Sequence, residues 1–310
     1  MQKKCPSIAY SAFFPYFCRT ISTIMRQRKS IRVIHVAVGI LFLTAIWVTS
    51  GCKREKTTTA DNANDPTGIV DNSGSKALFT TDSVRLSVKN EAGSAEVYID
   101  YPKGNSPAAQ EAKSFIRKQL FGDKPVKTAD NAEDVARQYC DMVILNFKSS
   151  LEQVNMTGVN KENAPEEGVE IRLVYQSKKV ITYESTHYAY FTGGGHGTYG
   201  TQGISIRITD GKRLNRIISN ERGVMGLVKR GLMTYFGVNN EAALADYCTV
   251  PLDVLPLPAN PPYFLEEGIR FQYNVYDICR FDDGDPWFTI PYDSIMPYLT
   301  EEARSLTFEH

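Results

Sequence analysis

Three successive segments of the sequence alternate apolar and polar residues, and this pattern constrains the fold more than any other feature. The segments run over residues 169–176, 180–191 and 203–209. Such alternation is typical of a strand with one buried face, because successive side chains point to opposite sides of a sheet. Lys178-Lys179 is placed to turn the first strand into the second, and Asp210-Gly211 predicts a tight turn after the third. These segments therefore predict neighbouring antiparallel strands.

Further strands and helices flank these three segments. A hairpin is predicted from the alternating residues 84–88 and 95–101. Ser106 and Pro107 suit the N-cap and first turn of a helix that Gly122 ends. The remaining patterns predict helices from about residue 131, over 220–236 and over 241–248, strands over 264–276 and 287–291, and a helical turn over 293–299. Because strands and helices are grouped rather than strictly alternating, the predicted fold class is α+β, with a largely antiparallel sheet packed with helices.

The first 51 residues have the pattern of an export signal. A basic segment over 25–32 precedes an apolar run over 33–48, and no acidic residue occurs before Cys52. The run is short for a membrane span, although a plain membrane-anchored helix is the alternative. Small residues before Cys52 resemble the lipobox of bacterial lipoproteins, which implies cleavage before this cysteine and a lipid on it. Because Met25 opens a signal of ordinary length, we expect it to be the translation start.

Removal of this signal changes the charge of the chain. Residues 1–51 hold seven of the 35 basic residues and none of the 35 acidic ones, so the net charge falls from zero to about −7. A protein of that sign is a poor nucleic-acid binder. Residues 52–76 are polar and predict a flexible tether. We expect a domain outside the cytoplasm, attached to a membrane of the bacterial cell envelope through the lipid on Cys52.

Three cysteines remain beyond the lipidation site, namely Cys140, Cys248 and Cys279. They have no CxxC spacing, and their odd number permits at most one disulfide. Buried thiols are an equal alternative, since cysteine also behaves as a small apolar residue.

The densest candidate for a functional site follows the second alternating strand, where four glycines and a histidine lie within five residues. Consecutive glycines permit positive φ and expose amide groups that can bind an anion or a partner. A crowded chain crossing fixed by the histidine is the alternative. Tyrosines here and on the distal strand can stack on a sugar or protein. The candidate ligand- or partner-binding residues are Gly193, Gly194, Gly195, His196, Tyr199 and Tyr276.

No complete catalytic or metal-binding pattern occurs in the sequence. His187 and His196 flank the glycines without HExxH or paired cysteines. There is no GxSxG or serine–lysine signature, and no Gly-Lys-Ser/Thr follows the glycines as in a P-loop. The acidic residues 282–285 lack the EF-hand pattern and predict a hairpin turn. We therefore predict no catalytic residue, no metal and no cofactor.

Two motifs stand out in the second half of the sequence. The first covers 190–197 and the strand that ends in 209–212, and the second covers 271–278 with Ile290-Pro291-Tyr292 after it. Together they resemble a known family, the DUF3298 domain. The resemblance spans about residues 165–300, and residues 84–121 are similar to a DUF4163 segment. It implies a DUF4163-like region over 77–165 and a DUF3298-like region over 166–305, packed as one unit. The polar residues 160–168 predict the loop between them.

The resemblance implies an extracytoplasmic module rather than a particular chemistry. DUF3298 is similar to the C-terminal part of the anti-sigma-V factor, which binds lysozyme as a signal. It also occurs in peptidoglycan deacetylases, whose activity lies in a separate domain. We expect a non-enzymatic lipoprotein that binds a cell-wall component or a wall-degrading enzyme such as lysozyme. The alternative is an envelope glycan hydrolase or deacetylase that uses His196.

Overall fold

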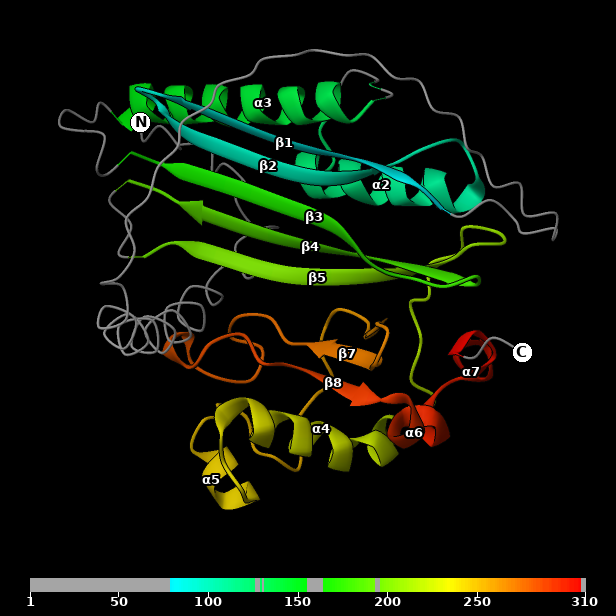
Figure 1. Cartoon of the computed structure of the whole chain (residues 1–310). Helices are drawn as coiled ribbons and strands as arrows, with labels where there is room; N and C mark the ends of the chain where they lie inside the picture. Colours follow the sequence, from blue (N-terminus) through cyan, green and yellow to red (C-terminus); the bar gives the residue numbers. More distant parts are fainter. Residues whose placement is uncertain (1–78, 126–128, 130, 155–163, 193–195, 308–310) are drawn as a thin grey trace, which may run out of the picture. The chain divides into compact units, whose positions relative to one another are not determined.

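A five-stranded sheet forms the centre of the first half of the chain (Figure 1). The computed structural model describes residues 79–125, 129, 131–154, 164–192 and 196–307, so the predicted signal, lipidation site and tether lie outside the described residues. In order across the sheet, the strands are β1 (Thr81–Asn90), β2 (Gly93–Pro102), β3 (Glu166–Gln176), β4 (Val180–Tyr190) and β5 (Thr198–Arg207). Three neighbouring pairs are antiparallel, and β2 pairs with β3 in parallel. The largely antiparallel sheet is therefore confirmed.

Two helices cover one face of this sheet, α2 (Pro107–Phe121) and α3 (Ala132–Val154) (Figure 1). They lie in the connection between β2 and β3, which a parallel strand pair requires to be long. The Ser106 side chain accepts a hydrogen bond from the Ala109 amide at 3.2 Å, so the predicted N-cap is confirmed. Gly122 ends α2 with a φ of 61°, a conformation that favours glycine.

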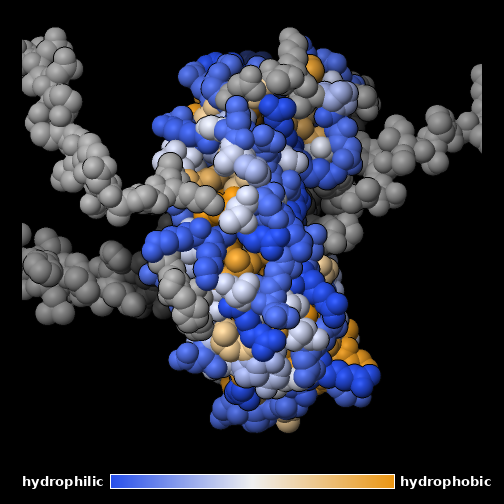
Figure 2. Space-filling view, turned by 90° about the vertical axis from the view of Figure 1, so that its right-hand side faces the viewer, coloured by the Kyte–Doolittle hydropathy of each residue, from blue (hydrophilic) through white to orange (hydrophobic). Residues whose placement is uncertain are grey.

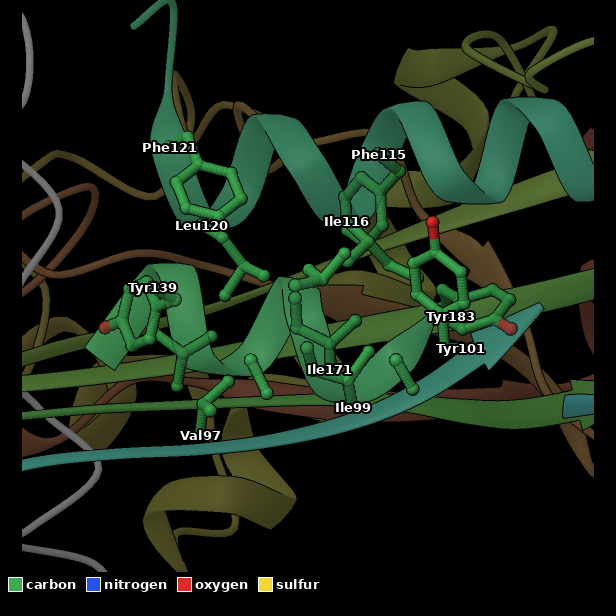
Figure 3. Close-up of a cluster of buried hydrophobic side chains, with 14 of the residues drawn as sticks. Val97, Ile99, Tyr101, Phe115, Ile116, Leu120, Phe121, Tyr139, Ile171 and Tyr183 are labelled. Carbon is green, nitrogen blue, oxygen red and sulfur yellow. The ribbon is translucent and has the colours of Figure 1, made fainter. Parts of the chain in front are cut away.

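The core between the helices and the sheet is apolar and closely packed (Figure 3). Phe115, Ile116 and Leu120 of α2 point toward Ile99 of β2 and Ile171 of β3. All five side chains are at least 97% buried. Burying a large apolar side chain contributes about 1.5–3 kcal/mol relative to exposure, so this layer holds α2 on the sheet.

The second half of the chain adds a smaller antiparallel sheet and its own helices (Figure 1). Its strands are β6 (Tyr263–Phe264), β7 (Gly268–Gln272) and β8 (Trp287–Pro291), and its helices are α4 (Glu221–Phe236), α5 (Glu241–Ala245), α6 (Tyr292–Ile295) and α7 (Glu301–Thr307). A second apolar core includes Val228 and Leu232 of α4 with Phe271 and Phe288 of the sheet. Together with the first half, these elements give an α+β fold, as predicted.

The smaller sheet meets the large one on the face opposite α2 and α3 (Figure 1). The Tyr263 hydroxyl donates to the Glu184 carboxylate at 2.6 Å, and the Phe264 amide donates to Ser205 Oγ at 2.9 Å. Gly203 makes room for the Tyr263 ring, because a Cβ atom at this position would lie 2.5 Å from it. Burial, and then Glu184, raise the pKa of the Tyr263 phenol, which therefore stays protonated as the donor.

Several predicted boundaries were wrong. The single strand expected over 264–276 is a short hairpin of β6 and β7, because Glu266-Glu267-Gly268 turns the chain and the Leu265 amide donates to the Gly268 carbonyl at 2.8 Å. The loop expected over 160–168 overlaps β3, which begins at Glu166 beside β2. The helix expected over 241–248 ends at Ala245.

The molecular surface shown in Figure 2 is mostly hydrophilic, with small separate hydrophobic areas. Large apolar side chains that stand exposed include Leu145, Phe191, Val254, Tyr276 and Trp287. Within the described ranges, no helix is both long and apolar enough to cross a membrane.

Candidate functional site

The glycine–histidine segment is the connection between β4 and β5. Ala189 of β4 and Thr198 of β5 form the strand pair that flanks it. Gly193, Gly194 and Gly195 lie outside the described residues. Gly197 has a packing reason to be glycine, since a Cβ atom there would lie 2.7 Å from the Tyr188 ring. At this position, close approach of an aromatic ring accounts for the glycine.

His196 and Tyr276, two of the predicted site residues, are brought to the same place by a third aromatic side chain, Phe281. The ring centroids of His196 and Phe281 are 4.1 Å apart, and those of Tyr276 and Phe281 are 6.3 Å apart. His196 is exposed, Tyr276 is 59% exposed and Phe281 is partly buried between them. We call these three residues the aromatic cluster. It joins the two sequence motifs into one surface.

The imidazole of His196 is oriented by the backbone of the next residue, Gly197. Its Nδ1 lies 3.1 Å from the Gly197 carbonyl oxygen, and a carbonyl can only accept. Nδ1 therefore acts as the donor in this contact. The ring packs against Phe281 in a tilted arrangement, with an interplanar angle of 30°.

Tyr276 sits in a tight turn with an unusual backbone conformation. Its φ is 63°, and it is the non-glycine residue with positive φ among the described residues. The Asp277 amide donates to the Asn274 carbonyl at 3.2 Å, and the Asp277 carboxylate accepts from the Asn274 amide at 2.7 Å. An L residue in this region costs about 1–2 kcal/mol. The turn therefore holds a bulky ring at the surface where glycine or asparagine would be less strained.

The loop that carries Phe281 is acidic and is anchored at several points. Residues 276–283 contain three aspartates and one arginine. Phe281–Asp283 form one turn of 3-10 helix, and Arg280 Nε donates to the Asp283 carboxylate at 3.0 Å. Below the loop, Ile278 is fully buried in the second core. The segment lies in the connection from β7 to β8, where a hairpin turn was predicted over 282–285. The structure has the 3-10 turn there, followed by the buried Asp285.

Tyr199 lies under the surface rather than on it. It is 2% exposed and pairs across the strands with Tyr188. Tyr183 and Tyr273 are fully buried as well. The structure thus presents Tyr276 to solvent and uses Tyr183, Tyr199 and Tyr273 for packing.

His187 and His196 belong to different surroundings. His187 lies on the helix-covered face of β4, where its Nε2 is 2.9 Å from Ser185 Oγ and 3.0 Å from Gln119 Oε1 of α2. Burial lowers the pKa of His187 to about 4. The two histidines are therefore not joint ligands, and the described residues contain no group of three or more His, Cys, Asp or Glu side chains placed to hold a metal ion.

A hollow of about 320 Å³ opens on the face of the large sheet opposite the helices. Its floor is Gly168, which lies between Glu96 of β2 and Tyr188 of β4 in one cross-strand row. A Cβ atom at Gly168 would have one neighbour within 4 Å, the Glu96 carbonyl oxygen, at 3.8 Å. Arg85 at the rim is ion-paired with Glu96. The missing side chain thus leaves a recess whose charged lining residues are Arg85, Glu96 and Glu170.

The architecture is similar to that of a solved protein from Bacteroides fragilis described as a member of the DUF3298 family. The TM-score is 0.59, the identity is 21%, and the alignment covers 74% of this chain and 97% of that one. The fold is that of a solved DUF3298 protein. A DUF3298 family protein from Pseudomonas aeruginosa aligns with a TM-score of 0.46 and 13% identity, over 72% of this chain and 96% of that one. No family model matches the sequence, and no curated protein does.

Sequence reasoning missed Phe281 and the hollow over Gly168. Phe281 stands in an irregular acidic stretch, where no periodicity separates a packed ring from an exposed one. Gly168 carried a usable signal, since a glycine within an alternating strand often marks close backbone approach or an open position. The signal was missed because residues 160–168 were predicted to be a loop rather than part of a strand.

Proposed function

We propose that this chain is a non-enzymatic binding module of the bacterial cell envelope, and that the aromatic cluster is its contact surface. The observation that carries the proposal is the meeting of His196, Phe281 and Tyr276 at the surface. Aromatic side chains are enriched where proteins bind partners, since they bury a large area with little loss of side-chain freedom. The strained turn at Tyr276 is consistent with a site kept for function rather than for stability.

A basic protein, such as a wall-degrading enzyme of the lysozyme type, suits this surface best. Residues 276–283 carry a net charge of −2, and the chain without its first 51 residues carries about −7. Opposite charge speeds encounter between proteins and suppresses wrong partners. The resemblance of the sequence motifs to the lysozyme-binding anti-sigma-V factor points in the same direction. The rings then supply the buried anchor, and the aspartates supply the polar rim.

A cell-wall saccharide is the second candidate partner, and the hollow over Gly168 favours it. Its volume falls within the usual range of small-ligand sites, and paired charges line it. A neutral, hydroxyl-rich ligand can exchange hydrogen bonds with such side chains without leaving a buried charge unpaired. The two partner classes thus correspond to two different surfaces of the module.

The arrangement of the histidines gives little support to the alternative of a hydrolase or deacetylase. His196 contacts an aromatic ring and its neighbouring backbone. The Ser185–His187 hydrogen bond resembles half of a catalytic triad, but Ser185 is fully buried and the third partner is the amide of Gln119. A histidine with a pKa of about 4 is also a weak base at neutral pH.

Calorimetric titration of the purified chain with lysozyme and with muropeptides tests the proposal. We expect a measurable dissociation constant for lysozyme that weakens as salt rises, because the loop is acidic. Turnover of a glycan substrate that falls in a His196→Ala variant would instead support the hydrolase alternative. Absence of binding to both partners would contradict the binding-module proposal.

A further inference from the structure

Two of the three described cysteines face each other. Cys248 and Cys279 form an isolated antiparallel β-bridge between the segment after α5 and the loop that carries Phe281. Cys140 lies elsewhere, in the core under α3, with its Sγ about 4 Å from the carbonyl oxygens of Leu86 and Ala95. All three are thiols in this structure. The fold thus selects one pair from the three combinations that the sequence left open.

The hydrogen bonding around this bridge shows how the two cysteines are paired. The Thr249 amide donates to the Ile278 carbonyl at 2.7 Å, one position beyond each cysteine. Cys248 and Cys279 therefore form the pair without mutual hydrogen bonds, in which Cα atoms are about 4.5 Å apart and side chains approach closely. Disulfides span Cα separations of about 4.4–6.8 Å, so the backbone already meets that requirement.

The surroundings place both thiols on one side of the bridge. Cys248 is partly buried, and Cys279 is 1% exposed within the second core. Directly opposed residues of an antiparallel pair project their side chains to the same face, so the side chains of Cys248 and Cys279 lie next to each other. The partial exposure of Cys248 gives an oxidant access to the pair.

We propose that Cys248 and Cys279 form a disulfide that ties the aromatic-cluster loop to the segment after α5. Cys248, as a thiolate, attacks a disulfide oxidant such as oxidised glutathione, and one glutathione thiolate leaves. The Cys279 thiolate then attacks the Cys248 sulfur of the mixed disulfide, and the second glutathione leaves. Two protein thiols are oxidised, two glutathione thiols are produced, and the two protons are shared with solvent and the leaving thiolates.

The linkage would act directly on the candidate site. Cys279 is two residues from Phe281 and three from Tyr276, so a covalent bond at Cys279 restricts the loop that presents both rings. Closing the 248–279 loop also removes freedom from the unfolded chain. The crosslink depends on fold geometry and on an oxidant, and not on the proposed partner. Its formation in the cell additionally rests on the expected export, because disulfides persist in oxidising compartments.

Peptide mapping of the full chain after native incubation with oxidised glutathione tests the inference. We expect one crosslinked peptide pair containing Cys248 and Cys279, in the wild type and in Cys140→Ser alike, and a melting temperature that falls by about 5–10 °C when the bond is reduced. Because burial and Asp283 raise the pKa of the Cys248 thiol, crosslinking is expected to be faster at pH 9 than at pH 7.

Cys248→Ser removes the crosslink and the reductant-dependent shift, while the mapping of the wild type remains decisive if that variant folds poorly. Two outcomes would overturn the inference. One is that both thiols remain open to alkylation after prolonged oxidation of the folded chain. The other is that Cys140 is crosslinked to either of them in place of the expected pair.

Discussion

The ring of His196 lies 4.1 Å from the ring of Phe281, centroid to centroid, although 85 positions separate the two residues in the sequence. One residue belongs to the connection between β4 and β5, and the other to the connection between β7 and β8. The contact therefore joins the large sheet to the small one at the surface. Tyr276 extends it, with its ring 6.3 Å from Phe281.

Tyr276→Gly is expected to relieve the backbone strain of the turn at this position. Glycine adopts a φ of 63° without the cost that a side chain carries, so the free energy of unfolding should stay equal or rise by about 1 kcal/mol. Tyr276→Ala removes the ring but keeps the strain, so it should be the less stable variant. Urea denaturation measures both. A glycine variant less stable than the alanine variant would contradict the strain at this turn.

Two glycines on the same face of the large sheet form a matched pair. Gly203→Ala places a methyl group 2.5 Å from the Tyr263 ring and is expected to lower the free energy of unfolding by about 1–3 kcal/mol. Gly168→Ala meets one atom, at 3.8 Å, and is expected to be neutral or to stabilise by about 0.5–1 kcal/mol. Equal effects of the two substitutions would mean that the smaller sheet does not pack on the large sheet through Tyr263.

His187 is expected to make the fold sensitive to mild acid. Its folded pKa of about 4 lies below the unfolded value near 6.5, so the unfolded state binds more protons between these values. The stabilisation is fully present above about pH 6.5 and is lost as the pH falls toward 4. Since the side chain keeps partial solvent access, we expect a loss of about 1–3 kcal/mol.

Denaturation at pH 7.5 and at pH 4.5 measures this effect against two variants. His187→Gln lacks the titrating group and should lose less stability between the two pH values than the wild type. His196→Gln changes an exposed histidine and should follow the wild type. If all three chains lost the same stability, the acid sensitivity would have to come from groups other than His187.

Much of the fold could be predicted from the sequence, because the local preferences of many residues agree with the packing of the folded chain. Ser106, Pro107 and Gly122 delimit α2 as their backbone preferences dictate, and the alternating residues of β3 and β4 form adjacent strands. The parallel pairing of β2 with β3 was not predictable, since strand alternation carries no direction. The break between β6 and β7 was also missed, because Leu265 continues the apolar pattern of a strand through a turn.

The candidate site could be predicted only in part from the sequence. Its two motifs were visible, but their meeting depends on Phe281, and an aromatic residue in an irregular segment gives no sign of its partner. Tyr199 illustrates the converse, since this tyrosine lies beside the glycines in the sequence but is only 2% exposed. Burial of a side chain on one face depends on which element covers that face, and sequence alternation does not specify the cover.

The role of the aromatic cluster in binding is tested most directly by comparing lysozyme binding by Phe281→Ala with binding by Trp287→Ala. Trp287 is also an exposed aromatic residue, but it stacks on Arg270 outside the cluster. Truncating a central aromatic anchor typically costs about 2 kcal/mol or more, which is a weakening of about 30-fold. We expect that weakening for Phe281→Ala and a change below about threefold for Trp287→Ala in calorimetric titration. Equal dissociation constants for the wild type and Phe281→Ala would contradict this role.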